Sequence, residues 1–141
     1  MSEPKIFTVA EAEHTLPLVR RVVHDLTLEY PRWRAALAHY EVLSGKARAE
    51  DGETDELVQA RETVMMHAGR INGFLDELEQ IGCLFKGFEN GLVDFYALRE
   101  DRLVYLCWKL GEEHIAYWHE IDAGYAGRQP IDGVLLAGPS Q

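Results

Sequence analysis

The stretch YLCWKLGEEHIAYWHEIDAGYAGRQPI, residues 105–131, gathers side chains that could do chemistry. It contains one cysteine, two tryptophans, two histidines, several carboxylates and an arginine. Carboxylates crowded beside an aromatic wall can have a raised pKa and act as an acid or a base. Imidazole, thiolate and carboxylate groups are also the common ligands of transition metals. Which chemistry is available depends on which of these side chains share one face of a sheet.

Strand alternation decides that question, because neighbouring residues of a strand point to opposite faces. If the two strands of this stretch are joined by an even turn within residues 111–114, Cys107 pairs with Trp118 and Tyr105 with Glu120. A tip at Glu100-Asp101 in the preceding hairpin places Asp94 opposite Cys107. This register predicts a polar face and puts His119 on the other face. The polar face carries Asp94, Tyr105, Cys107, Trp118 and Glu120, with Arg128 able to pair one carboxylate.

In a plainer interpretation these residues bind no ligand. Asp94 and Glu120 would face solvent from a half-covered sheet, and Cys107 would be a small core residue. Because the residues are selected only by their proximity in the sequence, the plainer interpretation is favoured.

A metal site is a second possibility for the same stretch. His114, His119, Glu120 and Asp122 offer nitrogen and oxygen ligands within nine residues, and Cys107 could add sulfur. However, Cys107 and His119 share a face only if the turn between their strands holds an odd number of residues. There is no HExxH motif and no paired CxxC motif. No metal ligand is therefore assigned, and His119 is interpreted as a partly buried histidine.

The first half of the chain is predicted to be a helical hairpin, with helices at 9–43 and 55–80 and a polar loop between them. Thr8 and Glu11 have the spacing of a capping box, and Pro17 and Pro31 are expected to kink the first helix or split off a short turn. Apolar or small residues then recur at alternating steps of four and three, which indicates a heptad seam. The seam runs through Ala12, Leu16, Val19, Val23, Leu26, Tyr30, Trp33, Leu37 and Tyr40.

This hairpin is expected to be longer than the sheet that it covers, since helices of roughly 25 residues reach about 40 Å. A second copy of the chain could bury the remainder of the seam, which predicts a homodimer. The alternative is that the aromatic seam residues pack on the sheet or on the second helix. The candidate interface residues are Tyr30, Trp33, Leu37 and Tyr40.

The second half changes to the period of β-strands after Gly82. Asn90-Gly91 is a strong signal for a tight turn, and short turns separate four predicted strands within 83–121. Residues 122–141 are rich in glycine and are predicted to be a coil-like tail. Helices followed by strands predict a single α+β domain over 1–141, in which a long antiparallel helical hairpin precedes a four-stranded antiparallel β-meander.

The composition and charge of the chain exclude some classes of binding partner. The 141-residue chain has a net charge of -10 and no cluster of Lys or Arg, which argues against nucleic acid and membrane surfaces. No signal peptide or membrane-spanning stretch is recognised. Cys83 and Cys107 both lie in apolar runs without CxxC spacing, which favours the reducing cytoplasm. Nucleotide-binding and hydrolase signatures of the GxGxxG, GxxxxGK[ST] and GxSxG types are absent.

Three segments together resemble a known family: FTVAEAEHTLPLVR, GLVDFYALRE, and YLCWKLGE followed by YWHEIDAGYAGRQPI. They are similar to a bacterial family known as domain of unknown function 2203, and the resemblance extends from Phe7 to Ile131. Tyr96 departs from the pattern, because such sequences usually place a proline after Val-Asp-Phe, and this affects the expected strand geometry only there. The resemblance implies kinship but no activity, substrate or cofactor.

Two hypotheses of function follow. The first is a cytoplasmic, non-enzymatic module that self-associates through its helical hairpin. The alternative is a protein, which could be an enzyme, that binds a small molecule or a metal with the polar face of the sheet and the Gly-rich tail. The sequence identifies no cofactor and no catalytic residue. Under the alternative, the binding residues are Asp94, Tyr105, Cys107, Trp118, His119, Glu120 and Arg128.

Overall fold

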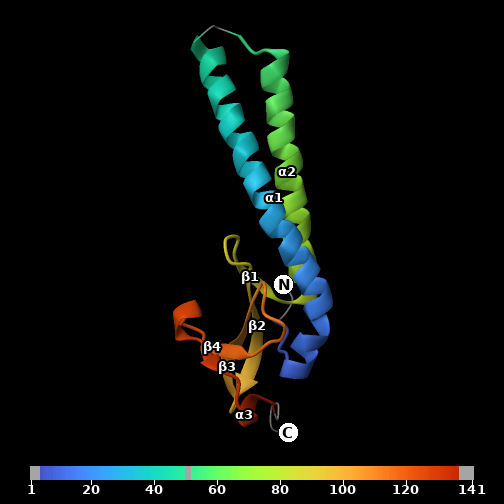
Figure 1. Ribbon diagram of the computed structural model, residues 1–141, viewed down its shortest axis with the longest axis vertical. Coiled ribbons are helices and arrows are strands. Elements are labelled where there is room, and N and C mark those ends of the chain that lie inside the picture. Colours follow the sequence, from blue (N-terminus) through green and yellow to red (C-terminus); the bar gives the residue numbers. More distant parts are fainter. Residues whose placement is uncertain (1–3, 50–51, 137–141) are drawn as a thin grey trace.

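A long helical hairpin rises from one side of a small antiparallel sheet (Figure 1). The computed structural model describes residues 4–49 and 52–136. The hairpin consists of α1 (Val9–Ala49) and α2 (Asp55–Ile81). The sheet has five strands in the order β1-β2-β3-β4-β5, so each strand pairs with its neighbours in the sequence. The predicted α+β class and helical hairpin are confirmed.

Local capping explains where the helices begin and end. The backbone N–H of Thr8 donates to Glu11 Oε1 (2.8 Å), and the N–H of Glu11 donates to Thr8 Oγ1 (3.1 Å), which confirms the capping box. Thr54 caps α2 by accepting from the N–H of Leu57, and Gly82 ends it at φ 105°. The helix α1 is not split at either proline, and it ends at Ala49, beyond the predicted end at residue 43.

One hydrophobic core joins α1 to the inner face of the sheet. The heptad positions of α1 from Ala12 to Leu26 are buried, as the seam predicts. Phe7, just before α1, packs edge-on against Phe95 with ring centroids 5.1 Å apart. The sheet contributes Val93, Phe95, Ala97, Val104, Leu106, Trp108 and Trp118 to this core.

The aromatic residues predicted for a dimer interface have partners within the chain. Tyr30 stacks on Phe88 with ring centroids 4.3 Å apart, and both Tyr30 and Trp33 pack against the core. Farther along α1, Tyr40 is half-buried and lies beneath the guanidinium of Arg61. These contacts use part of the seam surface, while a role of the seam in a dimer stays a prediction.

A buried polar contact joins α1 to α2 near the middle of the hairpin. The side chain of Glu29 is only 3% exposed, and its Oε1 lies 2.5 Å from Nδ1 of His67. Burial acts to raise the pKa of Glu29, but hydrogen bonds from His67 and Arg32 outweigh it and lower the pKa. Misaligned helices would leave this carboxylate buried without partners, so the contact favours a single helix register.

The strands are β1 (Leu84–Gly87), β2 (Leu92–Arg99), β3 (Arg102–Lys109), β4 (Tyr117–Glu120) and β5 (Gln129–Pro130). The predicted meander is correct except for its number of strands, because β5 adds an edge strand from the tail. The tail also holds a 3-10 turn, η1 (Tyr125–Gly127), and a short helix, α3 (Gly133–Leu136), in place of the predicted coil. Tail residues 137–141 lie outside the described residues.

The β2–β3 register agrees with the prediction. Glu100 and Asp101 form the tip, with φ of 52° and 64°, and Asp94 pairs with Cys107. Positive φ at both central residues is typical of a type I′ hairpin turn.

The β3–β4 register differs from the prediction by one residue. Cys107 pairs with Tyr117 and Tyr105 with His119, so the predicted pairs of Cys107 with Trp118 and Tyr105 with Glu120 are wrong. The connection is a wide loop with an odd number of residues, in which Ile115 is buried and its N–H donates to Glu13 Oε1 on α1 (2.6 Å). A shift of one residue reverses the face of every side chain of β4.

Gly91 allows the close approach of α1 to the sheet. It has φ +62°, and a Cβ there would lie 2.8 Å from Leu110 Cβ and 2.9 Å from Val23 Cγ1. We expect Gly91→Ala to lower the free energy of unfolding by about 2–4 kcal/mol, through left-handed strain and overpacking. Gly73→Ala, with open space around the added Cβ in α2, should raise it by about 0.5–1 kcal/mol. Urea unfolding measures both, and a stable Gly91→Ala variant would contradict the expectation.

Candidate metal centre

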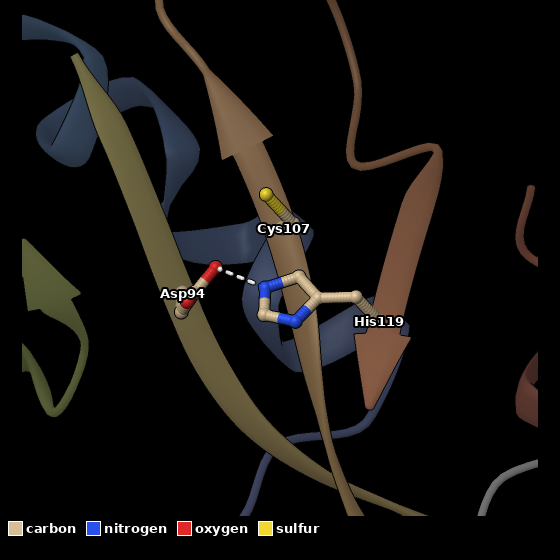
Figure 2. A group of neighbouring side chains, drawn as sticks. All are labelled: Asp94, Cys107 and His119. Carbon is tan, nitrogen blue, oxygen red and sulfur yellow. Dashed lines mark hydrogen bonds and ion pairs between the residues drawn. The ribbon is translucent and has the colours of Figure 1, made fainter. Parts of the chain in front are cut away.

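A carboxylate, a thiol and an imidazole meet on the outer face of the sheet, which is the face opposite the core that contains α1. Asp94 lies on β2, Cys107 on β3 and His119 on β4. Figure 2 shows His119 extending from β4 across β3 toward Asp94, with Cys107 beside them. Their exposed fractions are 3%, 2% and 3%. The loop between β3 and β4 has an odd number of residues and brings His119 to this face. The predicted turn with an even number of residues would have placed Trp118 there.

The hydrogen bonds of His119 fix the direction of its ring. Its Nδ1 lies 2.7 Å from the carbonyl oxygen of Glu120. Because a carbonyl oxygen only accepts, Nδ1 carries a proton and donates it there. The other nitrogen, Nε2, faces Asp94 Oδ1 at 3.2 Å. Metal-binding histidines are commonly oriented by such a bond from the nitrogen that does not bind the metal.

The ligand atoms of the three residues form a compact group. The carboxylate oxygen of Asp94, Sγ of Cys107 and the imidazole nitrogen of His119 all lie within 4.8 Å of one another. No other group of three or more His, Cys, Asp or Glu side chains with this proximity occurs within residues 4–49 and 52–136.

Burial keeps the Cys107 sulfur in its thiol form. Desolvation, followed by the nearby charge of Asp94, raises the pKa of Cys107 to about 12, while the charge of Arg128 acts in the opposite direction. A thiol with this pKa is a poor nucleophile at neutral pH. A bound metal cation would change that, because coordination deprotonates a thiol. The arrangement therefore fits a metal ligand better than a cysteine nucleophile.

The three side chains line a cavity of 210 Å³. Lys86 from β1, Tyr105 from β3 and Tyr125 from η1 also line it. The Lys86 Nζ lies 3.9 Å from Asp94 Oδ2 and 4.8 Å from the centroid of the Tyr105 ring. Burial and the hydrogen bond with Tyr96 raise the pKa of Tyr105 to about 12, so its phenol stays neutral. Lys86 is the one cationic residue among those that line this cavity.

A larger hollow of about 900 Å³ lies between α1 and the β3–β4 loop, and several of its polar groups already have partners within the chain. Arg20 donates to the carbonyl oxygen of Glu113, and the carboxylate of Glu112 accepts from Arg128. His114 lies 3.4 Å from Glu13. The smaller cavity is therefore the better candidate for chemistry.

Of the seven predicted binding residues, four line this cavity: Asp94, Tyr105, Cys107 and His119. The predicted orientation of Trp118 and Glu120 is wrong. Trp118 joins the core on the opposite face, beneath the guanidinium of Arg99, and Glu120 accepts two hydrogen bonds from Arg102. The one-residue shift of β4 is the reason for both.

Arg128 lies beside the cavity and outside its lining. Its Nη2 donates to both carboxylate oxygens of Glu112, at 2.7 and 2.8 Å, and to the carbonyl oxygen of Cys107 at 3.4 Å. The guanidinium also stacks on the ring of Tyr117, 4.0 Å from its centroid. Arg128 therefore pairs a carboxylate, as predicted, but one in the β3–β4 loop.

Sequence reasoning missed Lys86 and Tyr125. The β1–β2 pairing is irregular between Phe85 and Gly87, so Lys86 lies at a bulge and simple alternation does not place it. Tyr125 reaches the cavity through η1, in a segment without strand or helix periodicity. An assigned β1–β2 register would have revealed Lys86, whereas no local signal identifies Tyr125.

The two thiols offer a direct test of the site's electrostatics. Burial raises the pKa of Cys83 and that of Cys107 to about 12. At pH 8 only about one thiol in ten thousand would be ionised, so iodoacetamide should leave both unmodified in the native, metal-free protein. Unfolding in urea should expose both. Intact mass measures the modification, and rapid labelling of native Cys107 would contradict this environment.

None of the described helices combines the length and apolar character needed to cross a membrane. No curated protein and no solved structure matches the chain. The family described as "Uncharacterized conserved protein (DUF2203)" matches residues 5–131, which is most of the sequence and includes the three side chains of the site. The chain therefore belongs to the DUF2203 family.

Proposed function

We propose that this protein binds a divalent transition metal, with zinc as the best fit, through Asp94, Cys107 and His119. The observation that carries the proposal is the convergence of three different ligand atoms from three neighbouring strands within 4.8 Å. All three residues are buried and line one cavity.

The donor set favours zinc over other common metals. A thiolate and an imidazole suit Zn²⁺, whereas Mg²⁺ and Ca²⁺ prefer oxygen ligands alone. Bonds of about 2.0–2.3 Å in a tetrahedral site separate neighbouring ligand atoms by roughly 3.3–3.7 Å. The 3.2 Å between Asp94 and His119 is close to the lower end of this spacing, and rotation of the Cys107 side chain would bring its sulfur nearer. The hydrogen bond from His119 Nδ1 to the Glu120 carbonyl oxygen would hold the ring in the orientation that metal binding needs.

A zinc titration against a chromophoric chelator tests the proposal. The wild-type protein should bind one equivalent, and His119→Asn should bind it more than about 100-fold more weakly because one of three ligands is lost. His114→Asn is the matched control, since that imidazole is 75% exposed and lies outside the cavity. Equal affinity of His119→Asn and wild type would reject the proposal.

The state of the cysteines supports a reducing compartment. Cys83 and Cys107 are both free and buried. We propose that the protein is cytoplasmic, because thiols stay reduced there and Cys107 remains available to a metal.

The hairpin favours a second function, self-association into a homodimer that needs no enzymatic activity. Apolar side chains remain exposed along its distal part, with Val42 64%, Met65 66% and Met66 47% exposed. Exposed apolar side chains that gather in one patch mark sites of protein contact, and we propose that these three belong to such a patch.

Sedimentation velocity tests the homodimer. We expect the 141-residue protein to sediment as a dimer. The Val42→Ser and Met65→Ser substitutions should each convert it to a monomer. Leu136→Ser is a control on the opposite end of the molecule, where the side chain is 65% exposed. A wild-type monomer at all concentrations would reject self-association.

A further inference from the structure

We infer that the metal at this site takes the carboxylate of a small monocarboxylic acid as its fourth ligand, paired with the ammonium group of Lys86. The inference rests on the proposed metal binding and adds to it a ligand class. It follows from the coordination number, the charge balance and the size of the cavity.

The coordination number leaves one position open. Zinc is almost always four-coordinate in proteins, and sites with three protein ligands hold water or another exchangeable ligand in the fourth position. Asp94, Cys107 and His119 provide three ligands and line the cavity, so the remaining position faces the space that they enclose. No fourth His, Cys, Asp or Glu lies among the residues that line it.

The charges around this position favour a single negative charge. Zn²⁺, a thiolate, a carboxylate and a neutral imidazole sum to zero, and Lys86 adds one positive charge at the rim. The Lys86 side chain is 43% exposed and its Nζ lies 3.9 Å from Asp94 Oδ2. Coordination would direct that carboxylate toward the metal and leave the ammonium group free to pair with another anion. Arg128, the other nearby cation, is already paired with Glu112. A monoanion therefore completes the site, while a dianion would overcharge it.

The cavity limits the size and character of the ligand. A volume of 210 Å³ holds about seven water-sized groups, at roughly 30 Å³ each. Leu92 and Ile121 provide apolar lining beside the Tyr125 ring, which suits a short aliphatic or compact organic tail. Lys86 is held over the Tyr105 ring and can reach a carboxylate oxygen from there.

Cobalt substitution separates this inference from the proposed function. Co²⁺ replaces Zn²⁺ in tetrahedral sites and has visible absorption that depends on its ligands. A cobalt–thiolate absorption band that disappears in Cys107→Ser would establish the metal site itself. Absence of that band in the wild type would overturn the metal site, and the anion with it.

Acetate and inorganic phosphate are then titrated into the cobalt-loaded protein. We expect acetate to change the visible spectrum with saturation, and Lys86→Met to weaken acetate binding by roughly tenfold or more. Lys86→Arg should restore most of the affinity. Lys46→Met is the control: it makes the same change in net charge at an exposed residue in the last turn of α1, far from the sheet.

Three results would overturn the inference while leaving the metal site intact. One is a cobalt spectrum that neither acetate nor phosphate changes. Another is saturable binding of phosphate without binding of acetate, which would point to a different anion class. The third is equal acetate affinity in wild type and Lys86→Met, which would remove Lys86 from the site.

Discussion

Zinc in excess should raise the thermal unfolding midpoint of the metal-free protein by roughly 10–15 °C. The three proposed ligands come from β2, β3 and β4, so the unfolded chain has no assembled site and we expect the metal to bind only the folded state. At a free zinc concentration a thousand times the dissociation constant, this linkage contributes about 4 kcal/mol.

Variants of two histidines test whether the proposed site accounts for the stabilisation by zinc. Circular dichroism melts with zinc, and with zinc followed by a chelator, should show the shift in wild type and in His114→Asn. They should show almost none in His119→Asn. A similar shift in His119→Asn would mean that zinc stabilises the chain through other groups and that the site on the sheet is not responsible.

Trp108→Ala should lower the free energy of unfolding by about 3–5 kcal/mol, which is a large share of the 5–15 kcal/mol typical of a domain. The Trp108 side chain is fully buried in the core between α1 and the sheet. Its Nε1–H also donates to the carbonyl oxygen of Glu112 (2.9 Å), which holds the β3–β4 loop. The variant loses core contacts and leaves that carbonyl without its partner.

Trp108→Phe separates these two contributions. It keeps most of the apolar contact and removes the hydrogen bond, so we expect a loss of about 1–2 kcal/mol. Urea unfolding followed by far-ultraviolet circular dichroism measures both variants. Equal losses in Trp108→Ala and Trp108→Phe would show that the hydrogen bond, and not the packing, accounts for the stability.

The helices and most strands could be predicted from the sequence because their signals are local. The capping box at Thr8 and Glu11 and the heptad spacing both act within a few residues. The pair of Asp94 with Cys107 was predictable for the same reason, since a two-residue tip at Glu100-Asp101 fixes the register.

The face of His119 could not be predicted, because a distant contact determines it. The bond from the Ile115 N–H to Glu13 joins residues 102 positions apart and helps to hold the loop in its odd-length form. Local turn signals at Gly111 favoured an even turn instead. The exchange of Trp118 for His119 on the outer face therefore brings together the three residues of the proposed metal site.

Some boundaries were also missed for physical reasons. The helix α1 continues past residue 43 to Ala49 and includes Gly45, because packing against α2 outweighs the weak helix propensity of one glycine. The strand β5 is only two residues long and lies between Gly127 and Gly133, so its pairing with β4 leaves no periodic pattern in the tail.

The length of the hairpin divides the molecule into two levels of local stability. Glu29 is the last buried residue of α1, and beyond the contacts of Tyr30 and Trp33 with the core the two helices pack on each other. Helical amides beyond this contact should exchange with deuterium through small openings that begin at the tip. Amides of β2 and β3 should require global unfolding. The part of the hairpin beyond Glu29 can therefore open and re-form repeatedly while Asp94, Cys107 and His119 on the sheet keep their geometry.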